Sequence, residues 1–174
     1  MLRQACRLIP FERSIPAGVQ ISAELVWRRE GWLELSYGVL ARAAKGIGVL
    51  KLPEELNDGP QQGQRKDELW TTTCFEAFIA APGEQRYWEV NLAANGDWAL
   101  YRFDGYRSGQ TQQELSTPPT VRLQRGLHQL RLDARIALEP WWRPDVCPDL
   151  ALTCLLYTSP SPRDVEESRM PSSA

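Results

Sequence analysis

The sequence predicts an all-β fold, an antiparallel β-sandwich formed by a single domain. Several runs alternate apolar and polar residues, as half-buried strands do, and short turn sequences separate these runs. Aromatic residues, which are enriched in strands, concentrate in Leu69–Tyr106, where three of the seven Trp, three of the four Phe and three of the five Tyr lie. A length of 174 residues fits one domain with a real core.

The first elements are expected to be a hairpin and a short strand. Val19–Arg28 alternates over part of its length, and Trp32–Val39 follows after a turn, so the two are predicted to pair. Ile47–Leu52 is predicted to be a short apolar strand. Residues 53–67 are rich in Gln, Gly, Asp and Glu and are predicted to form a surface loop. That loop leads directly into Trp70, which places it at the rim of any site there.

The dipeptide Asn95-Gly96 predicts a hairpin with a two-residue type I′ turn, because alternating runs flank it. This turn would place Glu89 opposite Arg102. One face of the hairpin would then carry only apolar and aromatic residues, namely Trp88, Val90, Leu92, Ala99, Tyr101 and Phe103. The other face would carry Glu89, Asn91, Trp98, Leu100 and Arg102. Because this register separates the two sets cleanly, the first set is predicted to be core and the second to face outward.

The preceding strand can be added through a four-residue loop at 82–85. This register pairs Glu76 with Asn91 and sends Phe75, Ala77 and Ile79 into the core. It also keeps the Glu76 carboxylate out of an apolar interior, where an unpaired charge would be costly. If the strand runs back without a bulge, Trp70 shares the face of Glu76. The candidate ligand-binding residues on this outward face are therefore Trp70, Glu76, Glu89, Asn91, Trp98 and Arg102.

Aromatic rings beside polar side chains on strands are suited to binding sugars and other amphipathic small molecules. A ring face covers apolar C–H surface, while polar groups fix the orientation of the ligand. Trp70 would stack on the ligand, with Trp98 as a second platform. The simpler interpretation is that most of these rings are core residues, and that a Glu89–Arg102 cross-strand pair is structural, contributing about 0.2–1 kcal/mol.

The same residues resemble the DOMON-like domains related to family 9 carbohydrate-binding modules. The matching positions are Trp70, Glu76, Phe78, Tyr87, Trp88, Glu89, Asn91, Gly96, Trp98 and Tyr101 to Arg107. The similarity is densest over Leu69–Arg107 and extends loosely over Phe11–Leu156. It implies a jelly-roll-like β-sandwich that binds a small ligand, often a sugar, on a concave face. In these relatives a Trp placed like Trp70 stacks on the sugar, and a Glu placed like Glu76 hydrogen-bonds its hydroxyls.

One departure from the family pattern concerns Thr73. Many such modules carry an acidic residue at this position, three residues before the Glu. The departure leaves open both the sugar specificity and a nearby calcium site.

Non-catalytic binding of a small ligand, a saccharide above all, is the function that the sequence predicts. Two other functions stay open. The aromatic face could bind a partner protein, since exposed Trp and Arg also mark interfaces. Glu76 and Glu89 could instead form the carboxylate pair of a glycoside-processing enzyme. An Arg102 opposite Glu89 would keep that carboxylate ionised and a poor general acid, so no catalytic residue is assigned.

Two further strands are predicted after the aromatic hairpin. Residues 105–119 form a second long polar loop, and Val121–Arg125 and Gln129–Ile136 then pair across a short turn. Trp141 and Trp142 lie between prolines, which favours a hydrophobic plug under a loop over a second stacking surface.

The C-terminal part is predicted to change character after a last buried strand, Leu150–Leu156. Residues 1–156 would form the sandwich, and 157–174, which lack a hydrophobic period, would be a disordered tail. The tail resembles translated adapter or vector sequence, which would mean that the natural C-terminal end of the domain is missing.

Composition excludes several functions. With 20 basic and 22 acidic residues, the net charge of −2 does not suggest a nucleic-acid or membrane surface, and no run of 18 apolar residues could span a bilayer. The first ten residues are too short and too interrupted by Arg3 and Arg7 for a signal peptide, and the four Cys lack C-x-x-C spacing, so a cytoplasmic protein with reduced thiols is expected. With His128 as the only His, neither haem nor a zinc site is expected, and no cofactor is assigned.

Overall fold

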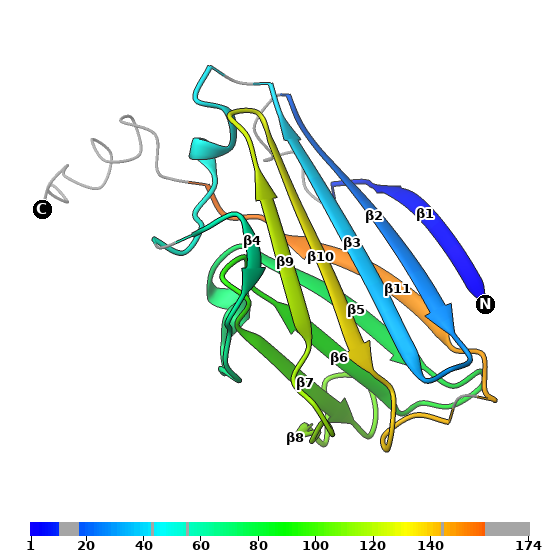
Figure 1. Ribbon diagram of the computed structural model, residues 1–174. Helices are drawn as coiled ribbons and strands as arrows, with labels where there is room; N and C mark the ends of the chain where they lie inside the picture. Colours follow the sequence, from blue (N-terminus) through cyan, green and yellow to red (C-terminus); the bar gives the residue numbers. More distant parts are fainter. Residues whose placement is uncertain (11–17, 43, 55, 144, 159–174) are drawn as a thin grey trace, which may run out of the picture.

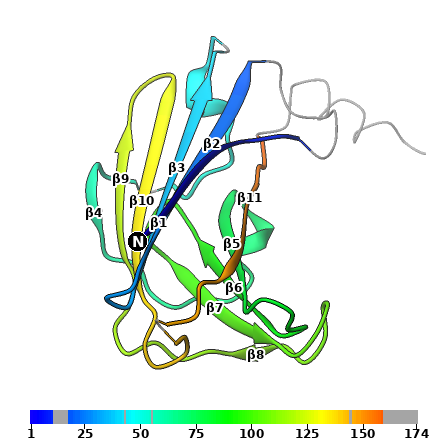
Figure 2. The same cartoon turned by 90° about the vertical axis from the view of Figure 1, so that its right-hand side faces the viewer.

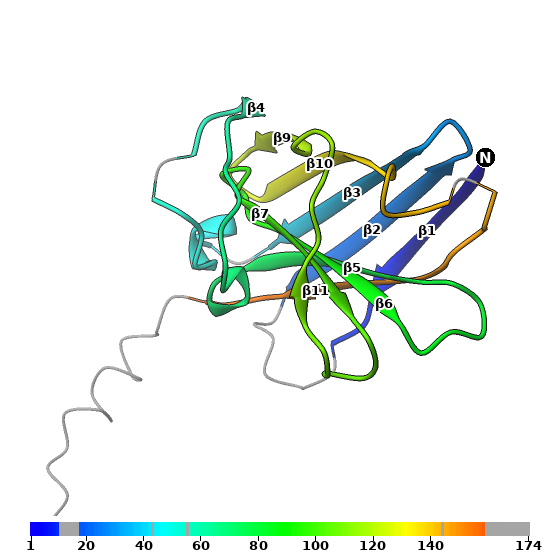
Figure 3. The same ribbon diagram turned by 90° about the horizontal axis from the view of Figure 1, so that it is seen from below.

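The computed structural model describes residues 1–10, 18–42, 44–54, 56–143 and 145–158, and it is a sandwich of two antiparallel sheets. The larger sheet contains, in spatial order, β1 (Leu2–Leu8), β2 (Val19–Arg28), β3 (Trp32–Ala41), β10 (Gln129–Ala137), β9 (Thr120–Arg125) and β4 (Gly59–Gln61). The smaller sheet contains β11 (Asp149–Leu155), β5 (Cys74–Ala80), β6 (Tyr87–Leu92), β7 (Trp98–Phe103) and β8 (Thr111–Gln112). The sheets form two layers (Figures 1, 2 and 3), which confirms the predicted fold class.

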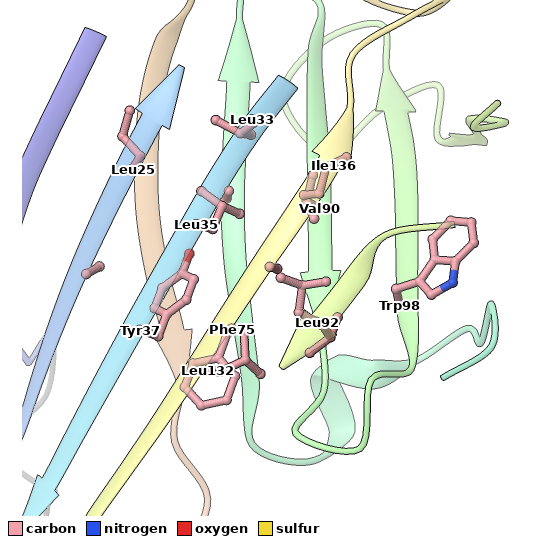
Figure 4. Close-up of a cluster of buried hydrophobic side chains, with 14 of the residues drawn as sticks. Leu25, Leu33, Leu35, Tyr37, Phe75, Val90, Leu92, Trp98, Leu132 and Ile136 are labelled. Carbon is pink, nitrogen blue, oxygen red and sulfur yellow. The ribbon is translucent and has the colours of Figure 1, made fainter. Parts of the chain in front are cut away.

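The core fills the space between the two sheets, because alternate residues of each strand point inward. Side chains from both layers meet there, among them Leu35, Phe75, Val90 and Leu132 (Figure 4). Tyr37 links the layers: its hydroxyl donates a hydrogen bond of 2.5 Å to the backbone carbonyl of Glu76 on β5.

Most of the predicted strands are confirmed. β2 and β3 pair as a hairpin, and β9 and β10 pair as the next one. β11 lies within one residue of the predicted last strand, but it is a half-buried edge strand and not the buried strand that was predicted. The predicted loops at 53–67 and 105–119 each contain one short strand, β4 and β8. Strand β1, which was not predicted, is an exposed edge strand whose sequence carries Arg3 and Arg7.

The predicted strand at 47–52 is wrong, because Gly46–Val49 is a 3-10 helix, η1. The backbone of the β9–β10 turn approaches it closely: the amide of Ile47 donates to the carbonyl of Leu127 at 2.9 Å. A Cβ atom on Gly46 would lie only 1.7 Å from that carbonyl oxygen. The contact with the turn, which the apolar run itself does not reveal, fixes this segment as a helix.

Trp141 and Trp142 form the predicted hydrophobic plug. Both are buried, and both rings lie against Trp88, with centroids 5.8 Å and 5.5 Å away. Their indole nitrogens donate to the carbonyls of Ala137 and Val146. The plug closes one end of the sandwich core.

The predicted tail lies mostly outside the described residues, which end at Thr158. Tyr157 still belongs to the sandwich, because its carbonyl accepts a hydrogen bond of 2.7 Å from the amide of Lys51. Among the described residues, no helix is long and apolar enough to cross a bilayer.

Candidate functional site

The strand registers decide which of the predicted residues share a face. The β5–β6 register is confirmed, since Glu76 lies opposite Asn91 and Phe78 opposite Glu89. The predicted β6–β7 register is wrong by one residue: Glu89 lies opposite Tyr101, whereas Arg102 lies opposite Trp88. A shift of one residue turns every side chain of β7 to the other face.

The cause of the shift is the turn at Asn95-Gly96, which has three residues in its loop where two were predicted. The amide of Ala93 donates to the carbonyl of Asp97 at 2.8 Å, and the amide of Gly96 donates to the carbonyl of Ala93 at 3.0 Å. Gly96 has φ +89°, which fits a type I turn followed by a left-handed residue. The side chain of Asn95 accepts a hydrogen bond from the amide of Asp97 and stabilises this form.

The predicted outward position of Trp98 and Arg102 is therefore wrong. Trp98 is 7% exposed and packs in the sandwich core, with the guanidinium of Arg65 4.6 Å from its ring centroid. Arg102 lies on the same side of β7, and its guanidinium is 3.7 Å from the carboxylate of Asp104. Tyr101 and Phe103 lie on the outer face instead of Trp98 and Arg102.

The outer face of the smaller sheet contains a cavity of about 540 Å³, called the Trp70 cavity below. Its lining residues are Trp70, Glu76, Phe78, Tyr87, Glu89, Phe103, Tyr106, Arg107 and Leu155. Of the six predicted site residues, three line it: Trp70, Glu76 and Glu89. The other lining residues were not assigned to a site, and Phe103 was assigned to the core.

Aromatic rings form one wall of the cavity. Tyr87 and Phe103 lie opposite each other on β6 and β7 and stack with centroids 4.7 Å apart and an interplanar angle of 3°. Phe78 on β5 continues the wall, 6.2 Å from Tyr87. Tyr87 and Phe103 are adjacent because directly paired residues of antiparallel strands share a face, and Phe78 is the diagonal neighbour of Tyr87 on the same face.

Trp70 enters the site from a short 3-10 helix, η2 (Leu69–Thr71), and its ring packs 6.0 Å from that of Tyr101. The hydroxyl of Tyr101 donates a hydrogen bond of 2.6 Å to the carboxylate of Asp67, and Gln112 on β8 donates to the same carboxylate. These bonds fasten the segment before η2 to the sheet, so Trp70 is held at the cavity.

Glu76 is the most deeply placed polar group of the cavity, at 6% exposure. Burial raises the pKa of its carboxyl group to about 7, and the nearby charge of Glu89 acts in the same direction. The hydroxyl of Thr153 donates to Oε2 at 2.9 Å and partly opposes this rise. At neutral pH the carboxyl group therefore exists in both protonation states.

Asn91, the remaining predicted site residue, lies on the same face but is fully buried beneath the cavity. Its Nδ2 donates to Oε1 of Glu89 at 2.9 Å, and its Oδ1 accepts a weak hydrogen bond from Sγ of Cys74 at 3.5 Å. Asn91 thus orients Glu89 and does not line the cavity itself.

Tyr106 and Arg107 form the rim. Tyr106 is 84% exposed, and the guanidinium of Arg107 lies 5.4 Å from the centre of its ring. The amide of Arg107 donates to the hydroxyl of Tyr87 at 3.4 Å, which ties this rim to the aromatic wall. The resemblance motif includes both residues, and the alternation pattern offers no signal for them because they follow the end of β7.

The described part of the chain contains no group of three His, Cys, Asp or Glu side chains that could hold a metal ion. Thr73, where the resemblance would place an acidic residue, is buried. Its hydroxyl bonds with the backbone of Tyr157. The Trp70 cavity itself presents carboxyl groups and aromatic rings.

Comparison with known proteins finds no matching family model and no matching curated protein. Among solved structures, the chain is similar to the crystal structure of "a putative carbohydrate-binding protein" from Bacteroides uniformis, with 11% sequence identity and a TM-score of 0.48. The similarity covers 79% of this chain and 60% of the Bacteroides protein. This chain therefore spans less than two thirds of the length of that protein.

Proposed function

We propose that the protein binds a small saccharide in the Trp70 cavity without chemically changing it. The observation that carries the proposal is the composition of the cavity, in which aromatic rings surround two carboxyl groups. Its volume of about 540 Å³ lies within the usual range of small-ligand sites. The sequence resemblance to carbohydrate-binding modules is consistent with this proposal.

Each group has a role that suits a sugar. The apolar C–H face of the sugar ring would lie against Trp70, and the Phe103–Tyr87 stack would cover its edge. The carboxyl groups of Glu76 and Glu89 would accept hydrogen bonds from hydroxyls, and Asn91 would hold Glu89 in position. Arg107 at the rim would donate to an outer hydroxyl.

Calorimetric titration of mono- and disaccharides tests the proposal. Replacing Trp70 with Ala should weaken binding about 5- to 100-fold, because stacking on an aromatic ring contributes on the order of 1–3 kcal/mol. Trp32→Ala is the matched control, since Trp32 is a half-buried Trp on the larger sheet, under the guanidinium of Arg135. Equal affinities of wild type and Trp70→Ala would contradict the proposal.

Glycoside hydrolysis is a second candidate, favoured by the raised pKa of Glu76 beside Glu89. An acid that is still protonated near neutral pH, next to a second carboxylate, is the arrangement that glycosidases use. Product analysis after prolonged incubation distinguishes the two functions. Recovery of intact sugar from a saturated complex would support binding alone, whereas release of a reducing sugar that is lost in Glu76→Gln would support hydrolysis.

A further inference from the structure

Among the residues that the structure describes, no cation lies within ion-pairing distance of the two carboxyl groups of the Trp70 cavity. Within the described residues, neither Glu76 nor Glu89 forms an ion pair, although Glu24, Glu34 and Asp133 on the larger sheet all do. The hydroxyl of Thr153 donates a hydrogen bond to Oε2 of Glu76. No donor among the described residues reaches Oε1 of the same carboxyl group. A buried carboxylate normally needs a positive partner or gives up its charge.

The rings around these carboxyl groups favour a positive charge as well. The faces of aromatic rings carry negative electrostatic potential and attract cations such as ammonium groups. Five of the nine lining residues are aromatic: Trp70, Phe78, Tyr87, Phe103 and Tyr106. Aromatic rings and two carboxyl groups therefore make up most of the cavity lining, with one exposed guanidinium, that of Arg107, at its rim.

The other ionisable groups near Glu76 do not supply the missing charge. They are Glu89 on β6, Cys74 on β5, Cys154 on β11, Tyr37 on β3 and Arg107 at the rim. Burial raises the pKa of both thiols and of the Tyr37 hydroxyl, so these three groups stay neutral near neutral pH. Arg107 is exposed and is stacked over Tyr106, outside ion-pairing distance of either carboxylate.

Building on the proposed saccharide site, we propose that its preferred ligand is an amino sugar whose free ammonium group lies against Glu76 and Glu89. The sugar ring would occupy the aromatic part of the cavity, and the ammonium group would donate hydrogen bonds to both carboxylates. A neutral sugar of the same size would leave both carboxyl groups without a counter-charge.

An amino-sugar ligand implies a strong dependence of affinity on pH. An ammonium group binds best to the ionised form of Glu76, whose pKa is raised to about 7. Affinity should therefore increase by about 15-fold between pH 5.5 and 7, as this carboxyl group loses its proton. Binding at pH 6.5 should release a proton, which titrations in buffers of different ionisation enthalpy would detect.

The test compares glucosamine, glucose and N-acetylglucosamine by calorimetry at pH 5.5 and 7. Glucosamine should bind about tenfold or more tightly than either neutral sugar at pH 7, because its hydrogen bonds to carboxylates are charge-assisted. Glu76→Gln and Glu89→Gln should each remove most of this preference. Glu24→Gln, which removes an equal charge from the outer face of the larger sheet, should retain it.

The outcomes separate the two proposals. If glucose and glucosamine bind equally and Trp70→Ala weakens both, the amino-sugar preference is overturned and the saccharide site stands. If the preference is also lost in Glu24→Gln, it reflects overall charge and the role of the cavity carboxylates is overturned. If the folded protein binds none of the three sugars, both proposals fail.

Discussion

At the scale of single residues, Glu76 connects the stability of the protein to its proposed function. Its carboxylate was predicted to lie outside the sandwich core, and it does lie on the opposite face of β5. The other residues of the Trp70 cavity cover this outer face of β5 around Glu76. The side chain of Glu76 is therefore buried, although it does not lie in the sandwich core. A carboxyl group in such a place costs stability when it is ionised, and a bound ligand can offset that cost.

Glu76→Gln should change the pH dependence of stability. The folded-state pKa of Glu76 is about 7 and its ordinary value is 4.5, so the folded protein binds more protons between these pH values. Its contribution is therefore fully favourable below about pH 4.5 and is lost as the pH rises through 7. We expect the variant to gain about 2 kcal/mol relative to wild type between pH 5.5 and 8. Urea denaturation at both pH values measures this, and an unchanged difference between the two proteins would show that Glu76 does not titrate in this range.

At the scale of elements, the β6–β7 hairpin shows where the sequence stops being informative. The β5–β6 register was predictable because only one register kept Glu76 out of the core. In β7, five of the six residues are apolar or aromatic, so alternation does not tell its two faces apart. The choice then depended on the turn, and Asn-Gly is compatible with loops of two or three residues. Hence Glu76 and Glu89 were placed on the correct face. Trp70 lies beside them, although it comes from η2 and not from the predicted continuation of the strand, whereas Trp98, Arg102 and Phe103 were assigned to the wrong face.

The turn itself can be tested with two glycines. Gly96 has φ +89°, and a Cβ atom there would lie 2.6 Å from Cβ of Gln61; Gly83 has φ +80° with open space around it. Gly96→Ala should therefore cost about 2–4 kcal/mol of unfolding free energy, and Gly83→Ala only about 1 kcal/mol. Denaturation curves of the two variants provide the comparison. Equal losses of unfolding free energy in the two variants would argue against close packing of the β6–β7 turn on Gln61 of β4.

At the scale of the whole molecule, the two faces of the smaller sheet have different roles. Its inner face completes the core, and its outer face carries the Trp70 cavity. The hydrogen bond from Tyr37 to the backbone of Glu76 joins the larger sheet to the strand directly beneath the cavity. The larger sheet therefore supports the site without contributing a lining residue.

Tyr37→Phe tests this support. Removing the hydroxyl leaves the buried carbonyl of Glu76 without its cross-sheet donor, which should cost about 1–3 kcal/mol. Thermal or urea unfolding measures the loss, and the sugar affinity of the folded variant shows whether the site is also affected. A variant as stable as wild type would mean that the two sheets do not depend on this bond.

The central claim, that the outer face of β5, β6 and β7 is the binding face, is tested most directly by a crystal structure of the protein with a bound saccharide. We expect a sugar ring against Trp70 and Phe103, with its polar groups within hydrogen-bond distance of Glu76 and Glu89. A saccharide bound at another surface, such as the hollow beside Gly38 on the larger sheet, with the Trp70 cavity empty, would contradict it.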